Sequence, residues 1–193
     1  NNMKYEAWAY YPESETWKQI DFSESPEFSD FIETPLGSIA IIAGKAYIHQ
    51  ISFVSDHSDH SRSEKTHATQ IKNLSNQVCT LAHHQLREYF SGTRTRFSLP
   101  LYIHGTPFQC LVWRTLATVP YGTTRSYKEL AQLSGNPRAA RAIGTVMHNN
   151  PLGIVLPCHR IIGANGELVG YYGGLHFKAW LLEHESRHCA RSV

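Results

Sequence analysis

The sequence lacks the features that mark a membrane protein or a disulfide-stabilised one. No apolar stretch approaches the roughly 20 residues that span a bilayer, and the first residues carry no signal-peptide pattern. The four cysteines are widely scattered without a C-x-x-C pair, which argues against a disulfide framework and a structural zinc site. With 193 residues, 41% of them hydrophobic, the chain is expected to be a soluble, intracellular globule with free thiols and with neither a metal nor another cofactor.

Acidic residues are almost missing from one part of the chain. Residues 1–100 hold nine Lys or Arg against twelve Asp or Glu, whereas residues 101–166 hold six against the single acid Glu129. A locally basic stretch favours a surface that binds a polyanion, although an ordinary solvated face with counter-charges from elsewhere in the fold is the alternative. The six basic residues are Arg114, Arg125, Lys128, Arg138, Arg141 and Arg160.

An apolar run over residues 154–162 is interrupted by Cys158, His159 and Arg160. The apolar residues on each side predict a buried strand or extended segment, so the cysteine should lie at the edge of a core. A thiol becomes a nucleophile as the thiolate, and a neighbouring histidine favours that form. Because cysteine is also among the most often buried residue types, this pair alone leaves a structural interpretation open.

The amino-terminal half of the sequence predicts an α/β domain. Residues 1–32 are aromatic and acidic without a clear period, and we assign them no role. Residues 35–54 predict a β-hairpin that turns at Gly44-Lys45, followed by a polar, exposed and mobile loop over 55–67. Further on, the spacing of apolar residues predicts a helix over 74–90 and a strand over 97–103. A domain boundary is expected near His104-Gly105, which gives an extension (1–32), an α/β domain (33–104) and a second domain (105–193).

The second domain begins with a helical pattern. Thr106 can cap a helix that continues to Val119, and Ser126 with Glu129 forms a capping box for a second helix that ends at Gly135. A third helix is expected over 138–148. Two short helices joined by a glycine-containing turn, the second one basic, predict a helix-turn-helix. Such units also occur without a DNA-binding role.

Two helices present informative faces. The third helix carries Arg138, Arg141 and Thr145 on one side and apolar residues on the other, so one side can pack while the other meets phosphate or bases. The final helix, over residues 174–186, places Glu185 on its apolar side, where an unpaired charge would be costly. His159 is a candidate partner, and the alternative is that Glu185 reaches solvent near the helix end.

Together these residues resemble the O6-alkylguanine-DNA alkyltransferase family, also called methylated-DNA–protein-cysteine methyltransferases. The specific match runs from Gly105 to Glu185, and the hairpin that begins Thr34-Pro35-Leu36-Gly37 resembles the start of the family's amino-terminal domain. The motifs, in order, are Gly105-Thr106-Pro107-Phe108-Gln109, Val112-Trp113, Pro120-Tyr121-Gly122, Ser126-Tyr127, Gly135-Asn136-Pro137, Ala140-Arg141-Ala142-Ile143-Gly144, Asn150-Pro151, Pro157-Cys158-His159-Arg160, Gly170-Tyr171, Gly173-Gly174, Lys178 and Leu181-Leu182.

The resemblance implies an α/β (α+β) protein with an RNase H-like amino-terminal domain and a mostly helical carboxy-terminal domain that holds the helix-turn-helix. It also implies DNA repair by direct, single-turnover alkyl transfer from O6-alkylguanine to a cysteine, with O4-alkylthymine as an open second substrate. The partner would be double-stranded DNA, bound by a monomer through the minor groove, with the damaged base flipped out. The protein would be cytoplasmic and nucleoid-associated in a bacterium, or nuclear in a eukaryote.

Roles carry over to five residues that match the family's active site. Cys158 would accept the alkyl group, His159 would relay its proton through a water, and Glu185 would orient and charge the histidine. Asn150 resembles an asparagine that bridges the helix-turn-helix and the active site. Tyr127 resembles a tyrosine whose hydroxyl donates to the departing guanine.

The resemblance also implies a role for Arg141 and a base pocket, and the helix face and the basic stretch supply the other expected DNA contacts. Arg141 resembles the residue that replaces the flipped base in the stack. The remaining expected DNA contacts are Arg138, Thr145, Arg125 and Lys128, and the expected pocket residues are Met147, Ile161 and Tyr172.

The chain departs from the pattern of some family members at Tyr172. Tyr172 is bulkier than the small residue of some relatives, which bears on pocket breadth. The cysteine cluster of the related regulatory proteins is absent, and Cys158 stands where lesion-binding proteins without repair activity have tryptophan.

The residues alone leave two other function classes as alternatives to alkyl transfer. A pure DNA-binding regulator would not need Cys158, His159 and Glu185 together. A cysteine hydrolase would not need a basic helix-turn-helix.

Overall fold

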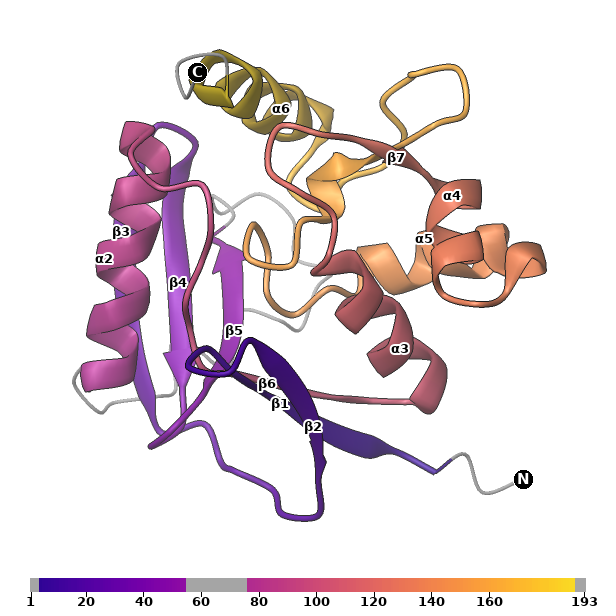
Figure 1. Ribbon diagram of the computed structural model, residues 1–193. Helices are drawn as coiled ribbons and strands as arrows, with labels where there is room; N and C mark the ends of the chain where they lie inside the picture. The colour runs from indigo at the N-terminus through magenta and orange to yellow at the C-terminus, as the bar shows by residue number, and fades with distance from the viewer. Residues whose placement is uncertain (1–3, 55–75, 190–193) are drawn as a thin grey trace. The chain divides into compact units, whose positions relative to one another are not determined.

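The computed structural model describes residues 4–54 and 76–189, drawn as ribbon in Figure 1. The chain divides into two compact units, Ala7–His104 and Asn1–Glu6 with Gly105–Val193. The expected polar loop over 55–67 lies outside the described residues. Within the described ranges, no helix combines the length and apolar character needed to cross a membrane.

The unit Ala7–His104 is built on a six-stranded mixed sheet with the strand order β2-β1-β6-β5-β4-β3. The pairs β1–β2, β3–β4 and β4–β5 are antiparallel, and β5 pairs with β6 in parallel. Helix α2 packs on β3, β4 and β5. The elements are β1 (Glu6–Tyr11), β2 (Thr16–Ile20), β3 (Phe28–Thr34), β4 (Gly37–Ala43), β5 (Ile48–Phe53), α2 (Gln77–Ser91) and β6 (Leu101–Gly105).

The sequence of each element explains its place. Residues Ile39 to Ala43 of β4 are all buried, and β4 lies between β3 and β5 in the sheet. Gly37 closes the β3–β4 turn with φ +101°, a left-handed conformation that glycine adopts without strain. Helix α2 begins where the Asn76 side chain accepts from the Cys79 N–H and ends at Gly92 with φ 82°.

The predicted hairpin is confirmed as β4–β5, with a register shift at Ile42/Ala43, although Pro35 and Leu36 belong to the preceding turn. The predicted helix is α2. The predicted strand over 97–103 starts only at Leu101 as β6. Residues 1–32, which had no assigned structure, contribute β1, β2 and most of β3 to the sheet.

The second unit is mostly helical. Thr106 and Ser126 each cap a helix through a complete capping box, as expected, and α3, α4 and α5 pack on one another. The indole N–H of Trp113 donates to the Val146 carbonyl and links α3 to α5 (3.2 Å). The elements are α3 (Pro107–Leu116), β7 (Arg125–Ser126), α4 (Tyr127–Leu133), η1 (Pro137–Ala139), α5 (Ala140–His148), η2 (Cys158–Arg160), β8 (Ile161–Ile162) and α6 (Leu175–Cys189).

The helix-turn-helix is therefore present as α4 and α5. Helix α4 ends at Leu133 rather than Gly135, and Arg138 lies in the short η1 turn before α5. The preceding helix, α3, ends at Leu116 rather than Val119.

The prediction of a continuous strand or extended segment before Cys158 is wrong. Residues 153–155 form a turn, in which Ile154 adopts φ +70° and which the hydrogen bond from the Leu156 N–H to the Leu152 carbonyl closes. Only Ile161 and Ile162, after the cysteine, form a short strand, β8, parallel to β7.

Candidate active site

Cys158 begins the single-turn η2 and is almost fully buried, with 4% of its surface exposed. The amide of Asn150 fixes its position. Asn150 Nδ2 donates to both the Leu156 carbonyl (2.7 Å) and Cys158 Sγ (3.2 Å), while its Oδ1 accepts from the Leu152 N–H (3.0 Å). The loop that leads from α5 to the cysteine is thus held by one side chain, and that side chain favours the thiolate by donating to sulfur.

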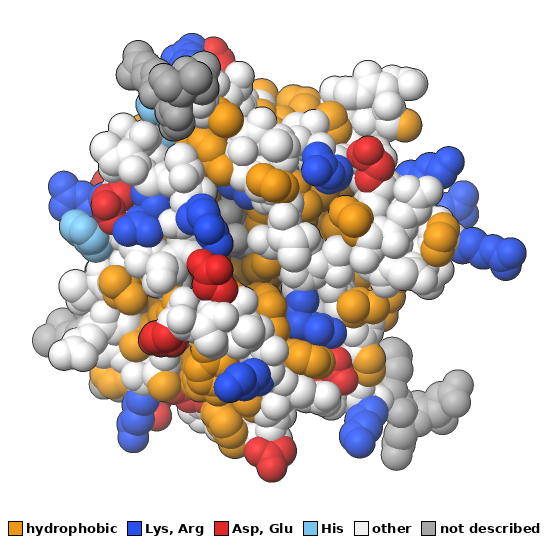
Figure 2. All heavy atoms as spheres, viewed as in Figure 1, with side chains coloured by type: hydrophobic (Ala, Val, Ile, Leu, Met, Phe, Trp, Pro, Cys, Tyr) orange, Lys and Arg blue, Asp and Glu red, His pale blue; other side chains and the backbone are white. Residues whose placement is uncertain are grey.

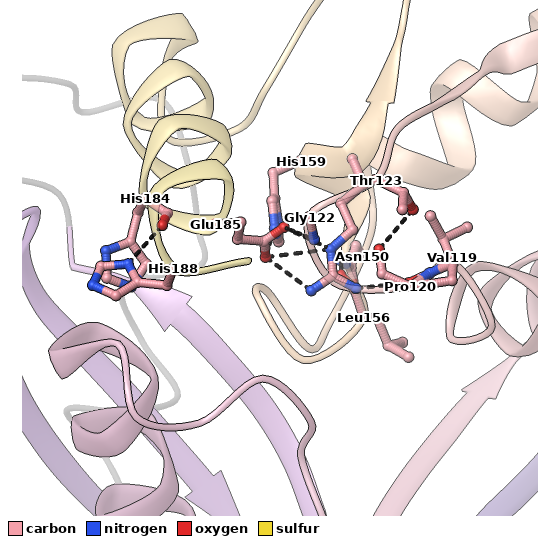
Figure 3. A network of polar contacts seen from close by, with 11 residues as sticks. Val119, Pro120, Gly122, Thr123, Asn150, Leu156, His159, His184, Glu185 and His188 are labelled. Atoms are coloured by element: carbon pink, nitrogen blue, oxygen red, sulfur yellow. Dashed lines mark hydrogen bonds and ion pairs between the residues drawn. The ribbon is translucent and has the colours of Figure 1, made fainter. Parts of the chain in front are cut away.

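His159 points toward helix α6, where the expected carboxylate is present (Figure 3). Its Nε2–H donates to Glu185 Oε1 at 2.8 Å, and both side chains are excluded from solvent. Since the carboxylate occupies Nε2, the other ring nitrogen remains to exchange a proton. Nδ1 is buried and has no hydrogen-bond partner among the residues that the structure describes.

Arg160 is a member of this network that sequence reasoning placed elsewhere. The sequence predicts it as part of the basic surface, but it is 7% exposed and donates to Glu185 through Nη2 to Oε1 (2.8 Å) and Nε to Oε2 (2.9 Å). Its Nη1 donates to the Val119 carbonyl (2.7 Å), and the Gly122 N–H donates to Glu185 Oε2 (3.3 Å). The position of Arg160 inside the apolar run over 154–162 is the sequence feature that indicates its burial.

Burial and charge act on these groups in opposite directions. Burial raises the pKa of Cys158 to about 11, although the Asn150 amide and the charge of Lys178 pull it down. Burial lowers the pKa of His159, and the Glu185 carboxylate counteracts that change. For Glu185 itself, burial raises the pKa, but His159 and Arg160 together bring it well below its usual range. The carboxylate is therefore ionised at neutral pH, and the thiol is protonated in the resting protein.

A second buried cation lies beside the cysteine. Lys178 of α6 is 1% exposed and donates to the carbonyls of Ile161, Val169 (3.1 Å) and Gly170 (3.2 Å). Its ammonium lies 6.0 Å from the centre of the Tyr127 ring. The Tyr127 hydroxyl also donates to the Val169 carbonyl (2.9 Å), and burial followed by the influence of Cys158 raises its pKa.

The expected DNA-binding residues lie on the helix-turn-helix. Arg141 and Thr145 of α5 are exposed, as are Arg138 in η1 and Lys128 in α4, while Arg125 is half-buried in β7. Figure 2 shows Lys and Arg side chains projecting from the edge where Figure 1 places α4 and α5. The structure thus separates these basic residues from the buried Arg160 and Lys178.

The expected pocket residues differ in burial. Met147 and Ile161 are buried, whereas Tyr172 is half-buried in the segment before α6. Among residues 4–54 and 76–189, no group of three His, Cys, Asp or Glu side chains is arranged to hold a metal ion.

Comparison with known proteins identifies two matching family models. The model described as "6-O-methylguanine DNA methyltransferase, DNA binding domain" matches residues 107–187, and the corresponding ribonuclease-like domain matches residues 28–103. Residues 4–27, which include β1 and β2, lie outside both matches.

Individual relatives agree with the family models. A protein of Methanosarcina barkeri named methylated-DNA–protein-cysteine methyltransferase is 39% identical over 158 residues, which cover 82% of this chain and 96% of that protein. One of the same name from Mycolicibacterium paratuberculosis is 52% identical over 109 residues, covering 56% of this chain and 66% of that protein.

Solved structures are similar as well. The crystal structure of the Mycobacterium tuberculosis O6-methylguanine methyltransferase superposes with a TM-score of 0.73 and 37% identity, over 83% of this chain and 93% of that one. A structure of the same mycobacterial protein in complex with DNA gives the same TM-score, identity and share of this chain, over 94% of that chain.

Proposed function

Because this chain belongs to the 6-O-methylguanine DNA methyltransferase family, we propose that it repairs DNA by moving the alkyl group of O6-alkylguanine onto its own Cys158. The observation that carries the proposal is the buried cysteine held by Asn150 beside the His159–Glu185 pair. The thioether that forms has no group to reverse it, so each protein molecule acts once.

The transfer is a displacement at the alkyl carbon. Cys158 loses its proton to His159 Nδ1, and the sulfur lone pair forms the new S–C bond. The electrons of the breaking C–O6 bond pass to the guanine, which gains a proton as it leaves. Tyr127 donates that proton, and the proton held by His159 returns to the tyrosine through water. The net change moves the thiol proton to guanine and the alkyl group to sulfur.

Each partner lowers the cost of forming the thiolate in a buried site. The Asn150 amide donates to the sulfur directly. The Glu185 carboxylate stabilises the imidazolium that forms when His159 takes the proton, and Arg160 keeps that carboxylate ionised and fixed. A resting thiol with a raised pKa is protected from adventitious alkylation, because reaction requires the proton to reach the histidine.

The helix-turn-helix is proposed to bind duplex DNA through the minor groove. Arg141, exposed on α5, would occupy the stack vacated by the flipped base, and the other exposed basic residues would contact phosphates. We propose that one protein monomer acts on one lesion, in the compartment that holds the genome.

Intact-mass measurement tests the proposal directly. After incubation with duplex DNA containing O6-methylguanine, the protein should gain the mass of one CH₂ group and stop at one equivalent. Peptide mapping should place it on Cys158, with the exposed Cys189 as an internal control. DNA binding without a mass gain would identify a regulator, and repeated turnover without DNA would identify a hydrolase. Duplex DNA with O4-methylthymine tests the second substrate.

A further inference from the structure

A four-residue turn lies against the carboxylate of the site. The N–H and the hydroxyl of Thr123 both donate to the Pro120 carbonyl, at 3.2 and 2.7 Å, and close a β-turn over residues 120–123. Gly122, at the third position, has φ +72°, whereas Tyr121 before it has no positive φ. This combination defines a type II turn, which favours glycine at the third position. Figure 3 shows the turn beside Glu185.

The turn completes the set of donors around the Glu185 carboxylate. A carboxylate has about four lone-pair sites on its two oxygens. Oε1 accepts from His159 Nε2 and from Arg160 Nη2, each at 2.8 Å. Oε2 accepts from Arg160 Nε at 2.9 Å and from the Gly122 N–H at 3.3 Å. Each oxygen therefore has at least two donors, and the turn supplies the second donor of Oε2.

The same turn also holds Arg160. The Val119 carbonyl, just before the turn, accepts from Arg160 Nη1 at 2.7 Å. The guanidinium carbon lies 5.6 Å from the centre of the Tyr121 ring, which is within the range of a cation–π contact. Residues 119–122 therefore contact both charges of the Arg160–Glu185 ion pair.

This turn separates the ion pair from solvent. Glu185 is fully buried, whereas Pro120 and Gly122 are exposed. One side of the turn thus faces water while the Gly122 N–H points at a buried carboxylate. Charges interact more strongly where water is excluded, so the turn strengthens the attraction between Glu185 and the His159 imidazolium.

Two observations explain why glycine occupies position 122. Its φ of +72° is a left-handed conformation that glycine adopts without strain. In addition, a Cβ on Gly122 would lie 2.9 Å from both Cβ and Sγ of Cys189, on the last turn of α6. The backbone of the turn is therefore packed directly on the helix that carries Glu185.

Resting on the proposed function, we propose that Gly122 and Tyr121 are positioning residues for alkyl transfer. The terminal torsion of a glutamate side chain is broadly distributed. The Gly122 N–H restricts that torsion so that Oε1 of Glu185 faces His159, and the Tyr121 ring holds the Arg160 guanidinium against both oxygens. When His159 takes the proton of the cysteine, the carboxylate is already aimed at the imidazolium, and no reorganisation is needed.

The first test removes a single N–H group. Glycolic acid is introduced in place of Gly122 by nonsense suppression, so that an ester replaces the amide and no side chain is added. The matched control carries the same change at Gly92 of the other unit, whose N–H donates to the neutral Tyr89 carbonyl (3.1 Å). Single-turnover transfer is measured at saturating O6-methylguanine duplex. The rate constant should fall roughly tenfold in the Gly122 ester, because a hydrogen bond to a charged group is lost. It should stay within about twofold in the Gly92 ester, since that bond is neutral and lies outside the site.

The rate constant and the amplitude of this reaction separate positioning from folding. A change that only destabilises the fold lowers the fraction of protein that reacts, and the folded fraction keeps its rate constant. Equal rate constants in the two ester proteins would overturn the proposal. Tyr121→Leu should be slower by about fivefold, and Tyr121→Phe should recover most of that loss because the ring is kept. Equal rates in these two variants would exclude a role for the ring.

A second measurement needs neither DNA nor alkyl transfer. In protein with ¹⁵N-labelled histidine, exchange of the His159 Nε2–H with water is followed by NMR. Because the turn shields its acceptor, Glu185, this proton should exchange roughly tenfold faster in the Gly122 ester than in the Gly92 ester. Equal exchange would refute the role of the turn. Failure of the wild-type protein to transfer an alkyl group would instead count against the proposed function, and this comparison would still test the turn.

Discussion

Replacement of Glu185 by Gln removes one negative charge but keeps the size of the side chain. The carboxylate that is lost accepts hydrogen bonds from three residues. In the folded protein this carboxylate accepts from His159, from Arg160 through both of its oxygens, and from the Gly122 N–H. The introduced glutamine side chain would keep one acceptor oxygen, but its NH₂ group would point at N–H donors and could not accept their hydrogen bonds. Arg160 is then a buried guanidinium without a counter-charge.

Two magnitudes follow. Breaking one side of a buried ion pair costs about 3–5 kcal/mol of folding free energy, since the remaining charge stays buried. The hydrogen bond that stabilises the His159 imidazolium is charge-assisted, and its loss is worth about 1.5–3 kcal/mol, or roughly 10- to 100-fold in the fraction of thiolate. Glu185→Gln should therefore unfold more easily and transfer the alkyl group at least about tenfold more slowly.

Glu183→Gln is a matched control on the same helix. Glu183 is exposed and pairs with Arg187 one turn away, an interaction worth roughly 0.3–0.5 kcal/mol. Single-turnover transfer from O6-methylguanine DNA, iodoacetamide reactivity against pH, and thermal unfolding are measured for both variants. If Glu185→Gln matched Glu183→Gln in transfer rate and in the pH midpoint of Cys158, the carboxylate would not be coupled to the cysteine and the triad would be refuted.

Three further outcomes are expected. Cys158→Ser should abolish transfer but leave the affinity for undamaged duplex within about twofold, because phosphate contacts supply most of it; a large loss of affinity in a binding titration would contradict this. Arg141→Ala should slow repair of duplex DNA by at least about tenfold if the side chain stabilises the extruded state by ~1.4 kcal/mol or more, while reaction with free O6-benzylguanine stays nearly unchanged; equal losses on both substrates would assign Arg141 to the fold. In urea titrations, stability should fall as pH drops below about 6.5, because folding lowers the pKa of His159 and the unfolded chain is protonated first. Stability should fall again below about pH 4.3, the ordinary pKa of a glutamate. Because folding depresses the pKa of Glu185, the unfolded chain takes up that proton first, and the stability that the ionised carboxylate contributes is lost as pH falls further. This second phase should be absent in Glu185→Gln.

Local chemistry was readable from the sequence because its causes lie within a few residues. The caps at Thr106 and Ser126 use side-chain bonds to backbone groups three residues away, so their residue types alone identified the helix starts. The β4–β5 hairpin follows from two apolar segments on either side of the short turn at Gly44-Lys45. The adjacency of Cys158 and His159 is a property of the chain itself, and it indicated the chemistry of the site.

What the sequence could not provide was the conformation around the cysteine. The apolar residues before Cys158 were consistent with a strand, and the structure has turns instead. Burial alone does not distinguish the two, because the backbone can satisfy its hydrogen bonds through Leu152 and Asn150 as well as through a neighbouring strand.

Tertiary structure also decided which charges belong to the site. Position on the apolar side of the last helix indicated that Glu185 needs a partner, but His159 and Arg160 lie 26 and 25 residues away in the chain. From the sequence, a basic residue such as Arg160 is predicted to lie at the surface. It is buried here because a carboxylate from a distant helix pairs with it. Packing of α6 on η2 brings these groups together, and the Glu185 carboxylate that it places against Arg160 makes the buried arginine compatible with a folded protein.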